Sequence, residues 1–247
     1  MRVYGKKVDV DEEKLLSFFN DRGKKHTIEN PQVTVMYQDN HPELATKRDL
    51  MERTKITPLL HITEQSTILD IGCGIGRWLD SFNKYESYLG ADFSPELIKI
   101  ANERFTNLQN VKFEVLSVQD IATQENFFSV KFSTVIFSGV MQYINDDLLY
   151  TLFNKLIMIC KEKSEIYIRC SIAMKERLIL SEEWSSELNS EYSAIYRTYD
   201  ECMMIIGNTL IKNGFKIESE GLMYSDNTKL NNRIETTQYY FILKRVQ

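Results

Sequence analysis

The 247-residue chain has the length of one well-buried domain with additions, or of two small domains. Its net charge of −5 argues against a protein that binds nucleic acid or an anionic membrane mainly through charge, and no apolar run approaches the roughly 18 residues that span a bilayer. The four cysteines lack metal-ligand spacing and a disulfide-scaffold pattern, and the N-terminus lacks the apolar core of a signal peptide. We therefore expect a cytoplasmic protein that works without a metal ion.

The first 64 residues predict a helical extension. Asp11 is placed to cap a helix that ends near Gly23, and Pro42 occupies the first turn of a second helix, which Pro58 disturbs. Residues 24–41 show no clear period, so we expect a loop there.

From residue 66 onward strands and helices alternate, which is typical of a parallel sheet with helices on both faces. The expected strands are 67–71, 87–91, 111–116, 133–137 and 165–170, followed by an antiparallel pair at about 215–224 and 235–245. Helices are expected to begin near Ile75, after Ser94, at Asp146 or Asp147, and after Asp200, where Asn213-Gly214 stops the last one. Residues 172–198 interrupt the alternation and are the expected substrate insertion.

A glycine-rich run follows the first expected strand, where residues 68–76 read Ile-Leu-Asp-Ile-Gly-Cys-Gly-Ile-Gly. Gly72, Gly74 and Gly76 permit a tight turn and a close backbone approach to a ligand, with amide N–H groups pointing at that ligand. The dinucleotide pattern G-x-G-x-x-G would need a glycine where Arg77 stands. The pattern Asp-x-Gly-x-Gly-x-Gly instead resembles the first motif of class I methyltransferases that use S-adenosylmethionine (SAM).

This resemblance, which is close over about residues 66–170, implies the fold and the domain plan. We expect a Rossmann-like α/β fold with a seven-stranded mixed sheet, helices on both faces and an N-terminal helical lid. Residues 1–64 would form the lid, and residues 65–247 would form the SAM-binding domain with the insertion at about 172–198.

The resemblance also implies the cofactor contacts. Asp70 would approach the ammonium group of SAM, and Asp92, which lies 20 residues beyond Gly72, would accept hydrogen bonds from both ribose hydroxyls. The backbone of Val118 would meet the adenine ring. The full expected set is Asp70, Gly72, Cys73, Gly74, Gly76, Asp92, Phe93, Val118, Gln119, Ser138 and Tyr143.

Two segments of this expected site leave alternatives open. Ser117 stands where the family often has an acid that reaches the adenine amino group, so Gln119 or Asp120 either takes over that contact or lies in a solvated turn. Residues 137–143 resemble the segment that lies along the methionine part of the cofactor, although Met141 and Tyr143 equally suit core packing. This segment lacks the Asn/Asp-Pro-Pro-Tyr/Phe signature, which disfavours methylation of nucleic-acid amino groups.

The acceptor site is less defined by the sequence. The polar and aromatic loop at 30–42, which contains Tyr37 and His41, has the composition of a recognition loop. Further candidates lie in the insertion, near the closing strands and elsewhere along the chain: Tyr192, Tyr196, Arg197, Tyr199, Arg233, Glu235, Gln238, Arg48 and Arg169. Each arginine taken singly is also a candidate for a surface or salt-bridge position.

The three histidines, His26, His41 and His61, all precede the first strand of the expected sheet. His41 is the one considered as a general base, the role that histidine most often fills. Otherwise a carboxylate or tyrosine removes the proton, or the acceptor is already anionic and is held by arginines such as Arg197 and Arg233. The expected catalytic residues are therefore His41, Tyr37, Arg197 and Arg233.

The function expected from these features is methyl transfer from SAM to a small polar acceptor, with S-adenosylhomocysteine (SAH) as product. The first expected acceptor atom is an oxygen on an anionic, sugar-linked or nucleotide-linked compound. The second is a nitrogen on a small amine or sugar. A protein or RNA methyltransferase and a non-catalytic SAM-binding partner subunit are the alternatives. The extension and tail weakly resemble methyltransferases of bacterial surface-polysaccharide and secondary-metabolite pathways. We expect a monomer or homodimer that neither binds nucleic acid nor spans a membrane.

Overall fold

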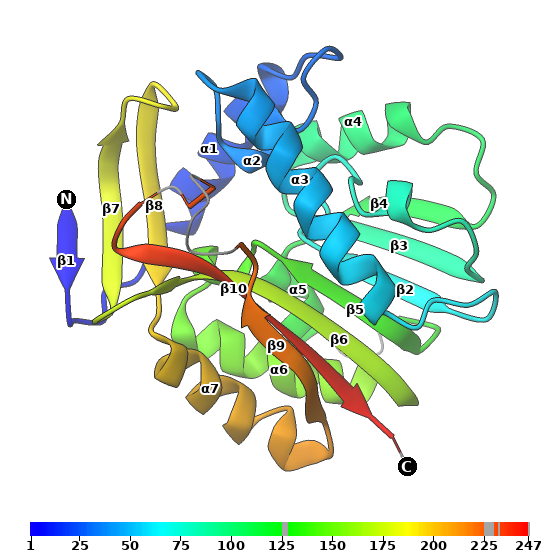
Figure 1. Ribbon diagram of the computed structural model, residues 1–247. Helices are drawn as coiled ribbons and strands as arrows, with labels where there is room; N and C mark the ends of the chain where they lie inside the picture. The colour runs from blue at the N-terminus through cyan, green and yellow to red at the C-terminus, as the bar shows by residue number, and fades with distance from the viewer. Residues whose placement is uncertain (125–127, 225–229, 232, 247) are drawn as a thin grey trace.

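A seven-stranded mixed sheet forms the centre of the protein (Figure 1). The structure is a computed structural model that describes residues 1–124, 128–224, 230–231 and 233–246. The strand order is β4-β3-β2-β5-β6-β10-β9, in which β10 runs antiparallel to both of its neighbours. The strands are β2 Thr67–Ile71, β3 Ser87–Asp92, β4 Val111–Val115, β5 Phe132–Ser138, β6 Cys160–Ala173, β9 Lys216–Leu222 and β10 Thr236–Arg245. The predicted Rossmann-like α/β fold is confirmed.

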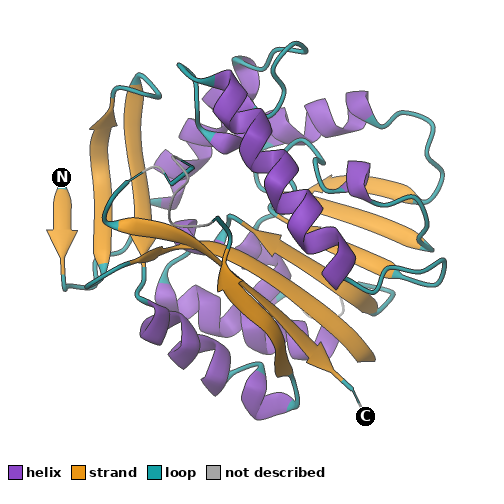
Figure 2. Cartoon of the chain, viewed as in Figure 1, coloured by secondary structure: helices purple, strands orange, loops and turns teal. Residues whose placement is uncertain are grey.

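Helices cover both faces of this sheet (Figure 2). The helices α5 Val118–Thr123, α6 Asp146–Ile159 and α7 Tyr199–Asn208 share one apolar core with the sheet. A second core joins the sheet to α4 Pro95–Arg104 and to the end of α3 Pro42–Ile56. Because both faces are covered, all five residues of β2 are buried. None of the described helices combines the length and apolar character that a membrane-spanning helix needs.

The N-terminal helices form as the capping residues predict. The side chain of Asp11 accepts hydrogen bonds from the amides of Glu13 and Lys14 and so caps α1 Glu12–Lys24. Pro42 stands in the first turn of α3, and the 3-10 helix η1 Thr57–Leu59 follows α3 at Pro58. The stretch expected to be a loop contains one short helix, α2 Val33–Met36.

The insertion forms a β-hairpin of β7 Leu178–Ser185 and β8 Ser190–Tyr196. An N-terminal strand that was not predicted, β1 Arg2–Tyr4, pairs with β7 and completes a separate three-stranded sheet. A third apolar core contains residues of this hairpin together with residues of α1 and α4. The N-terminal strand and a hairpin that is distant in sequence therefore build one small sheet.

The prediction of a helix beginning near Ile75 is wrong. The segment after β2 forms turns, and the 3-10 helix η2 Leu79–Ser81 is the helical element there. An α-helix needs consecutive residues near φ −63°, whereas Gly74 and Gly76 have φ of +56° and +74°. Two further differences concern caps: Thr198, not Asp200, caps α7, and Ser117 starts α5, which was not predicted. The 3-10 helices η3 Met141–Tyr143 and η4 Ile211–Asn213 complete the described elements.

Candidate active site

A cavity of about 1410 Å³, counting its open mouth, lies between the carboxyl ends of the strands and the N-terminal helices. Its floor comes from the ends of β2, β3, β5 and β6 and the turns that follow them. Helices α1, α2 and α3 contribute Leu15, Phe19, Val35, Met36 and Arg48. The β7–β8 hairpin and the closing segment contribute Tyr192, Tyr196, Tyr224, Arg233 and Gln238. Carboxyl ends of parallel strands are where ligands bind in open α/β sheets.

The glycine turn after β2 offers a bare backbone surface, and its amides are already bonded within the fold. The N–H groups of Gly72 and Cys73 both donate to the carbonyl of Ala91, at 2.7 and 3.0 Å, and the N–H of Gly76 donates to the carbonyl of Cys73. A Cβ on Gly72 would come within 2.2 Å of the Val140 side chain. The expectation of amides pointing at a ligand is therefore not met. The glycines instead allow other groups, such as the Val140 side chain, to approach the backbone closely.

Asp92, at the end of β3, is the acidic residue of the cavity floor. Its carboxylate accepts hydrogen bonds from the amides of Gly74, at 3.0 Å, and Ser94, at 2.9 Å, so its position is fixed by the backbone. Burial raises the pKa of Asp92 to about 6, although both amide hydrogen bonds act in the opposite direction. Each carboxylate oxygen keeps a lone pair that can accept from a ribose hydroxyl.

Asp70 is buried behind the cavity wall and does not line the cavity. Its carboxylate accepts a hydrogen bond from the hydroxyl of Tyr88 at 2.5 Å, and burial raises its pKa to about 7. Gly76 also lies off the cavity, where an added Cβ would meet the rings of Phe113 and Phe105. The direct contact between Asp70 and an ammonium group is therefore not supported by this geometry.

At the expected adenine end, Ser117 and Asp120 form a capping box for α5. The hydroxyl of Ser117 donates to the Asp120 carboxylate at 2.5 Å, and this bond lowers the pKa of Asp120. Asp120 does not line the cavity, whereas Val118 and Gln119 do. Of the two alternatives for the adenine contact, Gln119 is the one whose position suits it.

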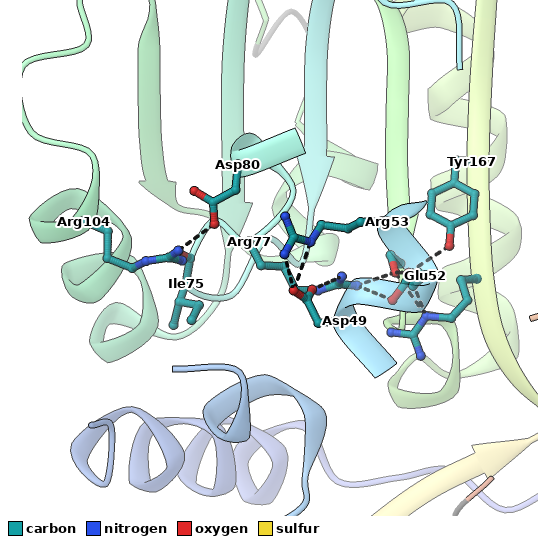
Figure 3. A network of polar contacts seen from close by, with 10 residues as sticks. Asp49, Glu52, Arg53, Ile75, Arg77, Asp80, Arg104 and Tyr167 are labelled. Carbon is teal, nitrogen blue, oxygen red and sulfur yellow. Dashed lines mark hydrogen bonds and ion pairs between the residues drawn. The ribbon is translucent and has the colours of Figure 1, made fainter. Parts of the chain in front are cut away.

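A network of buried charges joins α3 to the ends of the central strands, and the sequence analysis did not identify it (Figure 3). The Glu52 carboxylate, fully buried, accepts from Arg77 at 2.9 Å, Ser138 at 2.5 Å, Tyr167 at 2.8 Å and Arg169 at 3.1 Å. Burial opposes ionisation of Glu52, but the charges of Arg169 and Arg77 outweigh it and lower the pKa to about 2.

Three further ion pairs lie on α3 and around the glycine turn. Asp49, one turn before Glu52 on α3, pairs with Arg77 at 3.0 Å and with Arg53 at 2.7 Å. On the other side of the turn, Arg104 of α4 donates to the carbonyl of Ile75 and to Asp80. The spacing of Asp49 and Glu52 is a signal in the sequence, but it is equally typical of a solvated helix face.

Tyrosines and one arginine form a further part of the cavity wall, and one of these tyrosines, Tyr143, belongs to the expected cofactor set. The hydroxyls of Tyr143 and Tyr192 lie 2.7 Å apart, and the guanidinium of Arg233 donates to the hydroxyl of Tyr196 at 3.2 Å and lies over the Tyr192 ring at 5.5 Å. Tyr37 lines the cavity in the left-handed backbone conformation, with φ +56°. Burial raises the pKa of Tyr37 and, more strongly, that of the other three tyrosines.

Two of the expected catalytic residues lie elsewhere. His41 does not line the cavity; its ring is 56% exposed, and Nδ1 lies 3.5 Å from Glu43. Arg197 is buried and bonded to Asp146 and to the carbonyls of Met141 and Ile144, so its guanidinium is fully engaged in the fold. The assignment of Arg197 to an acceptor anion is therefore wrong.

Two other acceptor candidates also lie outside the cavity. Tyr199 donates to Glu220, and Glu235 pairs with Arg2. The expected residues that the cavity does bring together are Gly72, Cys73, Gly74, Asp92, Phe93, Val118, Gln119, Ser138, Tyr143, Tyr37 and Arg233, with the acceptor candidates Arg48, Arg169, Tyr192, Tyr196 and Gln238.

Comparisons with known proteins give a similarity over part of the chain. Residues 68–163 match a family model described as a methyltransferase domain. This segment is therefore similar to methyltransferase domains. No curated protein sequence matches the chain.

Solved structures of low sequence identity share the fold. A SAM-dependent methyltransferase from Leishmania major has a TM-score of 0.65 at 13% identity, covering 95% of this chain and 85% of that one. Phosphoethanolamine N-methyltransferase 1 from Haemonchus contortus, in complex with phosphoethanolamine and SAH, has a TM-score of 0.72 at 15% identity, covering 95% and 48%. Magnesium protoporphyrin IX methyltransferase from Synechocystis, with bound SAM, has a TM-score of 0.54 at 15% identity, covering 98% and 100%.

Proposed function

We propose that the protein transfers the methyl group of SAM to a small polar acceptor, in the first instance an oxygen, and releases SAH. The observation that carries this proposal is the cavity, which runs from Asp92 and the glycine turn to the wall that holds Tyr196 and Arg233. SAM supplies a methyl group on a sulfonium. The protein's part is to hold the acceptor oxygen in line with that methyl group, an effect worth up to roughly 7–11 kcal/mol.

The enclosure of the cavity supports a small acceptor. Val35 of α2 packs over the glycine turn, where it would lie 2.8 Å from a Cβ on Gly74. Phe18 and Phe19 of α1 contact the ring of Tyr37, and Phe18 also contacts Tyr192 of the hairpin. A nucleic-acid strand or a protein segment would need an open face, so these contacts favour a molecule that fits inside.

The protonation states of the cavity groups support an acceptor that needs no general base. Because burial raises the pKa of Tyr37 and Tyr196, both remain phenols at neutral pH and do not take a proton. The carboxylates among the described lining residues are Glu12 and Asp92, and Asp92 is the expected ribose partner. An oxygen that is already anionic can use its lone pair to form the new bond to carbon, while the carbon–sulfur electrons return to sulfur and no proton is released.

A nitrogen acceptor is the second candidate. The rings of Tyr37, Tyr143 and Tyr192 lie 6.1–6.4 Å apart in the cavity wall, and faces of aromatic rings attract cationic amines. One of the similar structures carries the name of an N-methyltransferase. Transfer to an ammonium group requires loss of a proton first, so this candidate also needs a base or a water path.

The test is release of SAH from purified protein and SAM with three acceptor sets: carboxylates and phosphates, neutral sugars and polyols, and amines. Turnover with the first set is the expected result, and turnover confined to amines would favour the second candidate. SAM binding without turnover in any set would indicate a macromolecular acceptor or a non-catalytic role and would contradict the proposal.

The cofactor part of the proposal has its own control. Asp92→Ala removes hydrogen bonds to a charged acceptor that are worth about 1.5–3 kcal/mol each, so SAM affinity should fall by at least about tenfold. Asp21→Ala removes a carboxylate from the exposed side of α1 and should leave SAM affinity unchanged. Equal SAM affinity in the wild type and Asp92→Ala would remove Asp92 from the cofactor site.

A further inference from the structure

Arg48 differs from every other buried arginine among the described residues. The buried arginines are Arg22, Arg48, Arg77, Arg169, Arg177 and Arg197. Each of the other five pairs with a carboxylate of the fold, at 2.6–3.1 Å. Arg48 is 5% exposed, and no hydrogen bond or ion pair joins its guanidinium to another described residue.

A buried guanidinium without a counter-charge is costly, because the loss of hydration is not offset by a partner. Burial lowers the pKa of Arg48, and the nearby charge of Arg169 acts in the same direction. The charge of Glu187 raises the pKa of Arg48 weakly, but no ion pair within 4.0 Å joins the two side chains. The Glu187 carboxylate accepts a hydrogen bond from the amide of Asn40. Arginine remains protonated in proteins, so the positive charge stays in the cavity wall.

Two other hydrogen-bond donors of the cavity wall lie beside Arg48. Tyr224 follows β9, interacts electrostatically with Arg48, and has no hydrogen-bond partner for its hydroxyl among the described residues. Arg169 uses Nε and Nη1 for Glu52, Ser138 and Gln238, which leaves Nη2 without a described partner. Three elements that are distant in sequence therefore each present a hydrogen-bond donor to the cavity.

We infer that Arg48, Arg169 and Tyr224 form a subsite for an oxyanion, a carboxylate or a phosphate, at the end of the cavity away from Asp92. The guanidinium fork and the phenol together match the planar or tetrahedral array of oxygens in these groups. The anion has two possible sources, the carboxylate of the methionine part of the cofactor and an anionic group on the acceptor. This inference rests on the proposed function for its ligands.

The experiment compares the wild type with Arg48→Gln and with Lys47→Gln, which removes a charge from the neighbouring exposed position of α3. Calorimetry measures the affinity of each for SAM and for decarboxylated SAM, which differs by the carboxylate alone. The SAH-loaded proteins are then titrated with inorganic phosphate and acetate. Tyr224→Phe, which removes one hydroxyl, is a second variant that keeps the test informative if Arg48→Gln does not fold.

If the cofactor supplies the anion, Arg48→Gln weakens SAM by about 10- to 150-fold and leaves decarboxylated SAM unchanged. If the acceptor supplies it, SAM affinity is kept and the binding of phosphate or acetate is lost. Tyr224→Phe should weaken binding of the same ligand as Arg48→Gln does, by about 2- to 10-fold. Lys47→Gln should bind every ligand as the wild type does.

Two results overturn the inference. One is unchanged affinity of Arg48→Gln for every probe, and the other is an equal loss for SAM and decarboxylated SAM, which would indicate a purely structural arginine. Failure of the proposed function is a separate outcome, because it shows as absent turnover or absent SAM binding in the wild type, whereas the subsite is tested by the difference between the wild type and Arg48→Gln. The phosphate titration, run on protein without cofactor, would still test the subsite.

Discussion

Substitution of Glu52 by glutamine should destabilise the protein strongly. The change removes the carboxylate shared by Arg77 and Arg169; Arg77 keeps Asp49 as a partner, but Arg169 loses its carboxylate partner. The pKa of Glu52 falls from 4.5 to about 2, which corresponds to about 3.4 kcal/mol in favour of the ionised form at 1.36 kcal/mol per unit. Breaking a buried pair by removing one partner typically costs about 3–5 kcal/mol, so the two values agree.

Urea denaturation followed by circular dichroism measures this loss, and a thermal scan should show a midpoint lower by roughly 6–20 °C for a chain of this length. The carboxylate has a lowered pKa in the folded state, so its contribution is complete above about pH 4.5 and is lost as pH falls toward 2. Glu52→Gln should flatten the stability profile in that window. Glu64→Gln, which breaks an exposed pair with Lys84, is the matched control and should change little. A loss below about 1 kcal/mol for Glu52→Gln would refute the reasoning.

Three further predictions concern the cavity and its surroundings. Burial raises the pKa of Asp92 to about 6, and ribose hydroxyls bind its ionised form. SAM affinity should therefore fall about tenfold between pH 8 and pH 5, and in Asp92→Asn it should not depend on pH in this range. His41→Ala should leave the rate of methyl transfer unchanged, because the ring lies outside the cavity; a loss of more than tenfold would return His41 to the mechanism. Arg197→Met should lower the free energy of unfolding by about 3–5 kcal/mol while the KM for the acceptor stays constant, since Arg197 binds Asp146; a raised KM with normal stability would argue for an acceptor contact.

The part of the cavity formed by the glycine turn and Asp92 could be predicted from the sequence because its signals are local. The glycines and Asp92 lie within 21 consecutive residues, and strand periodicity places them at adjacent strand ends. The same local reasoning failed for the hydrogen bonds of that turn. The amides of Gly72 and Cys73 bond to Ala91 on the neighbouring strand, a partner that depends on the register of the parallel pair.

The acceptor side could not be predicted in the same way, because its residues meet through contacts between distant parts of the chain. Arg169 donates to Gln238, which lies 69 positions away along the chain, and Arg233 donates to Tyr196 at a separation of 37. In a single sequence a buried arginine and an exposed one look alike. Arg48 and Arg197 were therefore both named as candidates. The fold separates them, because Arg197 pairs with Asp146 and Arg48 pairs with no carboxylate of a described residue.

The charge network has a consequence for how ligands enter the cavity. Helix α3 belongs to the N-terminal extension by sequence, but Asp49 and Glu52 bind it to the glycine turn, β5 and β6. Helix α2 is four residues long, and its Val35 contacts the turn through apolar atoms. Opening of the segment 33–41 breaks the ion pair of Arg22 with the half-buried Asp39 and the bonds of Arg22 to the carbonyls of Val33 and Thr34. Displacement of α3 costs more, because it exposes the carboxylates of Asp49 and Glu52, which are 2% and 0% exposed, and leaves Arg169 without its carboxylate partner.

We therefore expect the cavity to open by local release of α2 while α3 stays in place. Amide hydrogen exchange measures the free energy of such openings residue by residue. In the protein without cofactor, amides at 33–41 should exchange much faster than those at 45–56 of α3, and SAH should slow the first group. Equal protection of both segments, or faster exchange in α3, would contradict this mode of opening. Because α3 carries Arg48, a fixed α3 also keeps the proposed oxyanion subsite in place before any ligand binds.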